Sequence, residues 1–156
     1  MEEDILEDIR VKLIKYKIDF PDYILWIRPT TPLRDLSAFI KAYKIFQQKN
    51  NSVCIVSRSE PRIFYENKNF IKPFLKIFKN QSMVRRQDCP VVYKIFYGEF
   101  FKFPHKKNKK FLGDKIKFVE QNNKCDFDLD FDYQFQTFEN IIKNNKKKYE
   151  KFLHKY

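Results

Sequence analysis

The pattern of apolar and polar positions predicts two amphipathic helices in the first third of the chain. Residues 4–17 and residues 36–46 each carry apolar side chains three or four positions apart, which places them on one helical face. These side chains are Ile5, Leu6, Ile9, Leu13 and Tyr16 in the first segment and Leu36, Phe39, Ile40, Tyr43 and Phe46 in the second. Asp35 stands where it can cap the second helix.

Continuous apolar runs before and after the second helix predict buried strands at residues 23–27 and 52–57. A strand, a polar loop, a helix and a second strand make a βαβ unit, and unalternated strands favour a parallel sheet covered on both faces. The loops "RPTTPLR" and "SRSEPR" follow these strands. Ligands of such sheets bind at the carboxyl ends of the strands, so both loops are candidate binding loops.

The second half of the chain predicts two more strands and a final helix. The aromatic run 93–103 is typical of a core strand, residues 114–121 alternate like an edge or half-buried strand, and residues 133–153 form a helical stripe. The segment 69–80, "NFIKPFLKIFKN", favours neither state clearly. We expect one domain over residues 1–156.

Composition predicts a globular cytoplasmic protein. Of the 156 residues, 43% are hydrophobic and 18% are aromatic, which argues against disorder. No apolar run approaches the ~20 residues of a membrane-spanning helix, so we expect no membrane. The start, "MEEDILEDIR", is acidic where a signal peptide is basic. Three cysteines at unpaired spacings favour reduced thiols.

The net charge of +12 permits several anionic partners without selecting one. Nucleic acid, an anionic membrane or a small anionic substrate would each suit it, and a biased base composition also explains many lysines. Nucleic acid is not expected, because no nucleic-acid-binding motif accompanies the charge. Gly98 and Gly113 are the two glycines, and neither lies in a phosphate-binding loop. If the chain handles a nucleotide, its main phosphate-gripping loop lies elsewhere.

The sharpest chemical feature is the alternating run "CDFDLDFDYQF". In an extended segment its four aspartates, at positions 126, 128, 130 and 132, would share one face. A divalent cation would relieve their repulsion, and Mg²⁺ prefers one or two carboxylates together with phosphate oxygens. The alternative is an acidic, solvated strand edge in which Asp132 caps the last helix.

A second cationic cluster, Arg85-Arg86-Gln87-Asp88, precedes a Cys-Pro turn. Adjacent arginines suit a phosphate or a carboxylate, and a solvated basic loop is the alternative. His105 and His154 lie in lysine-rich segments with no serine or cysteine partner, so a catalytic triad is not expected.

Four segments together resemble one enzyme family. "PDYILWIRPTTPLRD" is similar to the strand and PTSPLR loop of the acylneuraminate (CMP-sialic acid synthetase-like) cytidylyltransferases, and "RRQDCPVVYK" to their RRQDLPPVYR segment. "FLGDKIKFVEQ" resembles the strand before their acidic motif, and "DLDFDYQFQTFENII" resembles DIDTExDFxxAExxL, with Phe135 as the matching phenylalanine. The motifs occur in the family's order and cover nearly all of residues 21–142.

The resemblance implies an α/β fold with a three-layer, Rossmann-like, mostly parallel sheet of nucleotide-diphospho-sugar transferase type. It implies transfer of CMP from CTP to an acidic nine-carbon sugar, with Mg²⁺ and release of pyrophosphate. Asp128 and Asp130 match the family's catalytic, metal-binding aspartates. The implied substrate-binding residues are Arg28, Thr30, Thr31, Arg34, Arg86, Gln87 and Lys94. Arg28 replaces a glutamine of several members, and it could pair with the sugar's carboxylate.

The chain departs from the family at its start. The family begins with a strand and a loop resembling ARGGSKGxxxKN, which binds the nucleotide, and Met1 falls in what looks like the helix after that region. We therefore expect an N-terminally truncated domain, an N-terminal fragment supplied in trans, or a catalytically inactive relic or interaction module of the same fold. A homodimer is a further expectation.

Overall fold

The computed structural model describes residues 2–48, 52–68, 70–75, 84–107 and 110–152. Half of the segment 69–80 and the last four residues, with His154, lie outside them. The chain divides into two compact units, Met1–Val56 with Ile95–Tyr156, and Ser57–Lys94. Each unit is described by itself, and the single domain expected from the sequence stays a prediction. No helix of the described residues is both long enough and apolar enough to cross a membrane.

A mixed sheet forms the centre of the first unit, with its strands in the order β1-β5-β2-β6. The strands are β1 (Tyr23–Trp26), β2 (Ser52–Arg58), β5 (Tyr93–Lys102) and β6 (Ile116–Glu120). β1 pairs antiparallel with β5, and β2 pairs parallel with β6. The sheet is therefore mixed, with the parallel pairing of β2 and β6 beside the antiparallel pairing of β1 and β5, and β5 lies between the two strands of the predicted βαβ unit.

The two predicted apolar strands differ in burial. β2 is buried from Ser52 to Ser57, so both of its faces are covered, as its unalternated sequence predicts. β1 alternates between exposed and half-buried side chains, with Tyr23 42% and Leu25 37% exposed. The prediction of a buried strand at 23–27 is wrong, because β1 is the edge strand among the described residues and stays partly exposed although Tyr23 packs against Tyr43 and Phe46 of α2.

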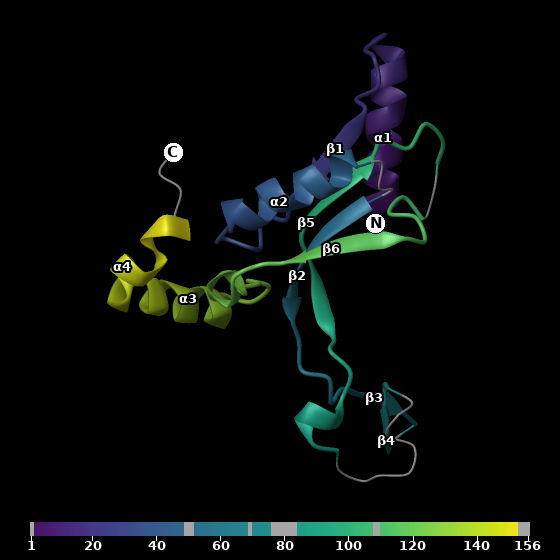
Figure 1. The fold of residues 1–156 in the computed structure, drawn as a ribbon. Coiled ribbons are helices and arrows are strands. Elements are labelled where there is room, and N and C mark those ends of the chain that lie inside the picture. Colours follow the sequence, from purple (N-terminus) through teal and green to yellow (C-terminus); the bar gives the residue numbers. More distant parts are fainter. Residues whose placement is uncertain (1, 49–51, 69, 76–83, 108–109, 153–156) are drawn as a thin grey trace. The chain divides into compact units, whose positions relative to one another are not determined.

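Helix α2 (Leu36–Gln47) covers one face of the sheet (Figure 1). Its buried side chains form a core with strands β2, β5 and β6; these are Ala38, Phe39, Ala42 and Phe46 packed with Val53, Ile55, Tyr97, Phe100 and Val119. Gly98 makes this contact possible. A Cβ atom there would lie 2.8 Å from the ring of Phe39, so only glycine lets the helix approach the strand this closely.

The C-terminal segment is helical but broken. Residues 133–153 were expected to form one helix, and the structure has α3 (Asp132–Asn144), α4 (Lys146–Tyr149) and a 3₁₀ turn η4 (Glu150–Phe152). Asn145 interrupts it, because its backbone (φ −134°, ψ 31°) lies outside the helical region. The break turns Tyr149 and Phe152 onto Leu33 and Cys125, where they bury a second small core.

Helix α1 (Glu2–Lys15) forms where the periodicity predicts it. Leu6 is its buried side chain, whereas Ile5 and Ile9 of the predicted stripe are 51% and 36% exposed. The predicted three-layer arrangement stays a prediction.

The second unit is small and contains a two-stranded hairpin. β3 (Phe64–Asn67) pairs antiparallel with β4 (Phe70–Pro73), and a 3₁₀ turn η2 (Arg86–Asp88) follows. The backbone N–H of Ser59 donates to the carbonyl of Val92 at 2.9 Å, which ties the two ends of the unit together.

Candidate functional site

Two loops that lie far apart in the sequence meet in the first unit. One is the segment 27–35 after β1, and the other is the acidic segment 126–131, which follows the 3₁₀ turn η3 (Asn123–Cys125). The backbone N–H of Leu129 donates to the carbonyl of Thr30 at 2.8 Å. This hydrogen bond places the aspartates on either side of Leu129 beside the threonine loop.

The two loops border one open cavity of about 520 Å³. Its lining residues are Glu2, Ile5, Trp26, Arg28, Pro29, Thr30, Asp128 and Asp130. Four of them, Arg28, Thr30, Asp128 and Asp130, are site residues that the sequence predicted separately. The fold therefore combines a guanidinium, a threonine and two carboxylates at one surface.

The sequence predicts that the four aspartates share one face if their segment is extended. Residues 126–131 form no strand, and the four carboxylates do not share one environment. The Tyr97 hydroxyl donates to Asp126, and Asp132 is the first residue of α3. That leaves Asp128 and Asp130 at the cavity.

The cap of α3 also bears on the alternative of an acidic strand edge. In that alternative Asp132 caps this helix, but the cap is made by the Gln134 side chain. Its Oε1 accepts from the N–H groups of Asp130 at 2.7 Å and Phe131 at 2.9 Å. Gln134 thus fixes the backbone at Asp130, a role that the sequence analysis missed.

Arg28 is the cation of the cavity. Its Nη2 donates to Glu2 Oε1 at 2.8 Å, across 26 positions in sequence. The hydrogen bond from Arg28 lowers the pKa of the Glu2 carboxyl, so the carboxylate is ionised at neutral pH. Glu2 was missed by the sequence analysis, because nothing in the helical pattern of α1 predicts a contact with the distant loop.

The other polar residues of the loop brace it. Thr31 is 2% exposed, and its hydroxyl donates to the Arg28 carbonyl at 3.0 Å. Arg34 Nη1 donates to Thr31 Oγ1 at 2.8 Å and Arg34 Nη2 to the Arg28 carbonyl at 2.8 Å. Thr31 and Arg34 hold the backbone that carries Arg28, and their contact with substrate stays a prediction.

The cavity could supply some of the ligands of a magnesium ion but not all six. Within the described part of the chain, no three or more His, Cys, Asp or Glu side chains gather as a metal-binding group. Three carboxylates, however, line the cavity; Glu2 pairs with Arg28, and Asp128 and Asp130 are the two that remain for a cation. Mg²⁺ is commonly held by one or two carboxylates, with water and substrate phosphate oxygens completing the octahedron.

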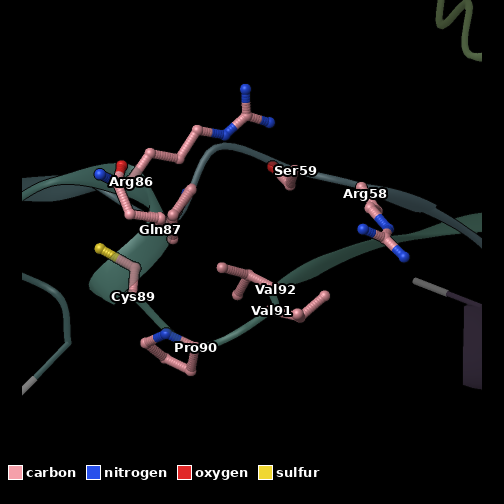
Figure 2. A pocket seen from close by; sticks show the side chains of 9 residues that line it. Arg58, Ser59, Arg86, Gln87, Cys89, Pro90, Val91 and Val92 are labelled. Atoms are coloured by element: carbon pink, nitrogen blue, oxygen red, sulfur yellow. The ribbon is translucent and has the colours of Figure 1, made fainter.

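The remaining predicted site residues lie in the second unit. Arg86 and Gln87 line a cavity of about 390 Å³ (Figure 2), together with Arg58, Ser59, Pro61, Cys89, Pro90, Val91 and Val92. Arg85 instead pairs with Asp88 at 2.8 Å. Lys94 is the last residue of this unit and lies exposed on β5. Arg58 belongs to the "SRSEPR" loop that the strand-end argument selected.

Comparison with known proteins identifies the fold and no family. No protein-family model matches this sequence, and no curated protein matches it either. Among solved structures, the 4-diphosphocytidyl-2C-methyl-D-erythritol synthase from Anaerococcus prevotii is similar, with a TM-score of 0.54 and 13% sequence identity. The match covers 85% of this chain and 64% of that one, so this chain spans less than two thirds of its length.

The fold of this chain is thus like that of the synthase, a mixed α/β architecture. At 13% identity the likeness extends to the fold alone. The acylneuraminate resemblance rests on the four sequence motifs.

Proposed function

We propose that this chain is part of a cytidylyltransferase that transfers CMP from CTP to an acidic nine-carbon sugar, such as sialic acid or a relative, with release of pyrophosphate. One observation carries the proposal. Arg28, Thr30, Asp128 and Asp130 line one cavity, although the two loops that supply them lie about a hundred positions apart. The fold likeness to a synthase of a diphosphocytidyl product is consistent with this class.

Each group of the cavity has a role in this proposal. The guanidinium of Arg28 binds the sugar's carboxylate, for which its fork of N–H donors is suited. Asp128 and Asp130 hold Mg²⁺, which would neutralise charge on the phosphates. The anomeric hydroxyl of the sugar attacks the α-phosphorus of CTP, a new P–O bond forms, and the bond to pyrophosphate breaks. Arg86, Gln87 and Lys94 contribute further substrate contacts, as the resemblance implies.

The grip on the CTP phosphates has to come from outside the described residues. Gly98 lies inside β5, and Gly113 lies in a turn with φ 74°. Neither forms the run of N–H groups that cradles a phosphate. We propose that a glycine-rich loop is supplied by a separate segment, for example an N-terminal fragment in trans.

Calorimetry with CTP and Mg²⁺, carried out with a fragment that supplies the glycine-rich loop, tests the metal assignment. We expect Asp128→Asn and Asp130→Asn each to weaken Mg²⁺-dependent binding by about tenfold or more, because each removes one of two carboxylate ligands. Asp132→Asn is the matched control, since Asp132 lies at the start of α3 and does not line the cavity. Equal affinities for all four proteins would contradict the assignment.

An activity assay tests the role of the missing loop. Release of pyrophosphate from CTP and N-acetylneuraminic acid is expected only when a fragment carrying the glycine-rich loop is added. If the chain alone reacted at the rate of a complete enzyme, the proposed loop in trans would be wrong.

The position of the two glycines also favours a second candidate, a catalytically inactive relic or interaction module with this fold. That candidate predicts no binding of CTP, and no change of Tm with Mg²⁺. The same calorimetry and a thermal scan decide between the two.

A further inference from the structure

We propose that Glu2 is an internal competitor at the candidate site, whose carboxylate occupies the Arg28 guanidinium until a ligand carboxylate replaces it. The inference rests on the proposed function, because it assumes that the ligand's carboxylate pairs with Arg28. It adds a residue outside all four motifs that lowers the affinity of the site for an acidic ligand.

The contact is specific to Glu2 among the acidic residues that begin α1. Glu2 Oε1 lies 2.8 Å from Arg28 Nη2, and both side chains line the 520 Å³ cavity. Glu3 lines a different small cavity with Leu6, Glu7 and Arg10. Asp4 lies 3.5 Å from Lys107. The first turn of the helix therefore directs one carboxylate into the candidate site.

Two carboxylates, Glu2 and Glu99, line a smaller cavity with Arg28, and they differ in burial. Glu99 on β5 is 3% exposed. The Glu2 side chain is 36% exposed and belongs to the first residue of a helix. A ligand that enters from solvent can reach the Arg28–Glu2 pair, so it would compete with Glu2 and leave the buried Glu99 in place.

The competition favours anionic ligands. A partly exposed ion pair is weak, so a ligand carboxylate that also gains contacts to the cavity can displace Glu2. A neutral sugar has no carboxylate that could form an ion pair with Arg28, so the pair between Glu2 and Arg28 remains. Glu2 therefore sets how tightly an acidic ligand binds, and a neutral ligand does not compete with it.

Trp26 provides a direct readout. It is the single tryptophan of the chain and lines the same cavity as Glu2 and Arg28. Its fluorescence can be followed while the full chain is titrated with N-acetylneuraminic acid, and separately with the neutral methyl ester of that sugar. The titrations are made on the wild type, on Glu2→Gln and on Glu3→Gln.

We expect Glu2→Gln to bind the acid about two- to fivefold more tightly than the wild type, the range set by the strength of a partly exposed ion pair. Glu3→Gln removes the same charge from the same helical turn but lines another cavity, so its affinity is expected to equal that of the wild type. The ester is expected to bind all three proteins equally weakly.

Two results would overturn the inference, and they differ. If the acid binds but Glu2→Gln is no tighter than Glu3→Gln, the competition is wrong and the proposed substrate stands. If the acid changes Trp26 fluorescence in none of the three proteins, the proposed substrate class is wrong and the inference falls with it. Arg28→Gln is the control, because without the guanidinium the acid is expected to bind no more tightly than the ester.

Discussion

Arg28 and Arg34 belong to one loop, yet the structure gives them different roles. Arg28 lines the cavity, whereas the guanidinium of Arg34 donates hydrogen bonds to the Thr31 hydroxyl and to the Arg28 carbonyl. The sequence presents both as equivalent cations in "RPTTPLR", because a residue type does not reveal where its side chain points. Mutations at the two positions should therefore differ in kind.

We expect Arg34→Ala to lower the free energy of unfolding by about 2 kcal/mol, since it leaves Thr31 and a loop carbonyl without a charged donor. Arg28→Ala should cost under about 1 kcal/mol, because its pair with Glu2 is partly exposed. Urea unfolding of both variants measures the difference. Equal losses would show that Arg34 does not brace the loop.

The three cysteines differ in burial. Burial raises the pKa of Cys54 to about 12, with a smaller contribution from Glu99, and burial likewise raises the pKa of Cys125 to about 12. Cys89 is half-buried, with its Sγ 3.5 Å from the Arg85 carbonyl. All three thiols are free, in agreement with the sequence.

At about pH 8 we expect a thiol reagent to label Cys89 alone in the folded chain, because the two buried thiols are both protonated and inaccessible. All three should react in guanidinium. The variant Cys89→Ser should show no rapid labelling in the native state, and rapid labelling of a second site would contradict the burial of Cys54 or Cys125.

At the scale of elements, Asp35 connects helix α2 to the segment after β6. Its Oδ1 accepts from the N–H of Ser37 at 3.2 Å and from the Ser37 hydroxyl at 2.6 Å. Its Oδ2 accepts from the N–H of Asn122 at 3.0 Å. The capping role follows from the sequence, while the bond to Asn122, 87 positions away, depends on the fold.

Asp35→Ala is expected to lower the free energy of unfolding by about 1–3 kcal/mol, since it removes an N-cap and leaves the Asn122 N–H without this acceptor. Ser37→Ala, which keeps the carboxylate, should cost less. Chemical denaturation measures both. A loss for Asp35→Ala no larger than that for Ser37→Ala would contradict the second contact.

The same residue predicts a dependence on pH. Burial alone would raise the pKa of Asp35, but the hydrogen bonds from Ser37, Asn122 and Ala38 outweigh it, and the pKa lies below its ordinary value of 3.8. The stabilisation is therefore complete above pH 3.8 and is lost as pH falls through the lowered pKa. In Asp35→Ala, the free energy of unfolding should therefore fall less between about pH 5 and acid pH than it does in the wild type.

At the scale of the whole molecule, the chain exposes many large apolar side chains. On the hairpin of the second unit, Phe70 and Ile71 are each 73% exposed, and Phe74 just after it is 68% exposed. A two-stranded hairpin is marginally stable by itself, and exposed apolar patches commonly mark an interface. This surface is consistent with the homodimer that the family resemblance implies.

We expect the sedimentation mass to rise with protein concentration, and the double variant Phe70→Lys/Ile71→Lys to shift this association to higher concentrations. Lys68→Glu, on the same hairpin, is a control that changes charge without removing apolar surface. A monomer at every concentration, or an unchanged profile for the double variant, would contradict an interface at the hairpin.

Much of the fold follows from local patterns, and the failures have a common cause. The strand β2, the helices α1 and α2 and the core strand β5 form where the periodicity predicts them. The adjacency of strands, the exposure of β1 and the break at Asn145 were not predicted, because each depends on which element packs beside another. The same holds for the aspartates, whose spacing is that of a strand although residues 126–131 form none.

By itself, the sequence predicted which residues could carry chemistry: the aspartate pair Asp128 and Asp130, the cation Arg28 and the cap Asp35. The family resemblance selects this pair among four aspartates, whereas charge and hydrogen-bonding capacity are properties of single side chains and can be read from residue type. Only the tertiary structure decided that the first three line one cavity, that Arg34 braces its loop and that Glu2 pairs with Arg28. These contacts join positions far apart along the chain, and the packing of the fold brings them within hydrogen-bonding distance.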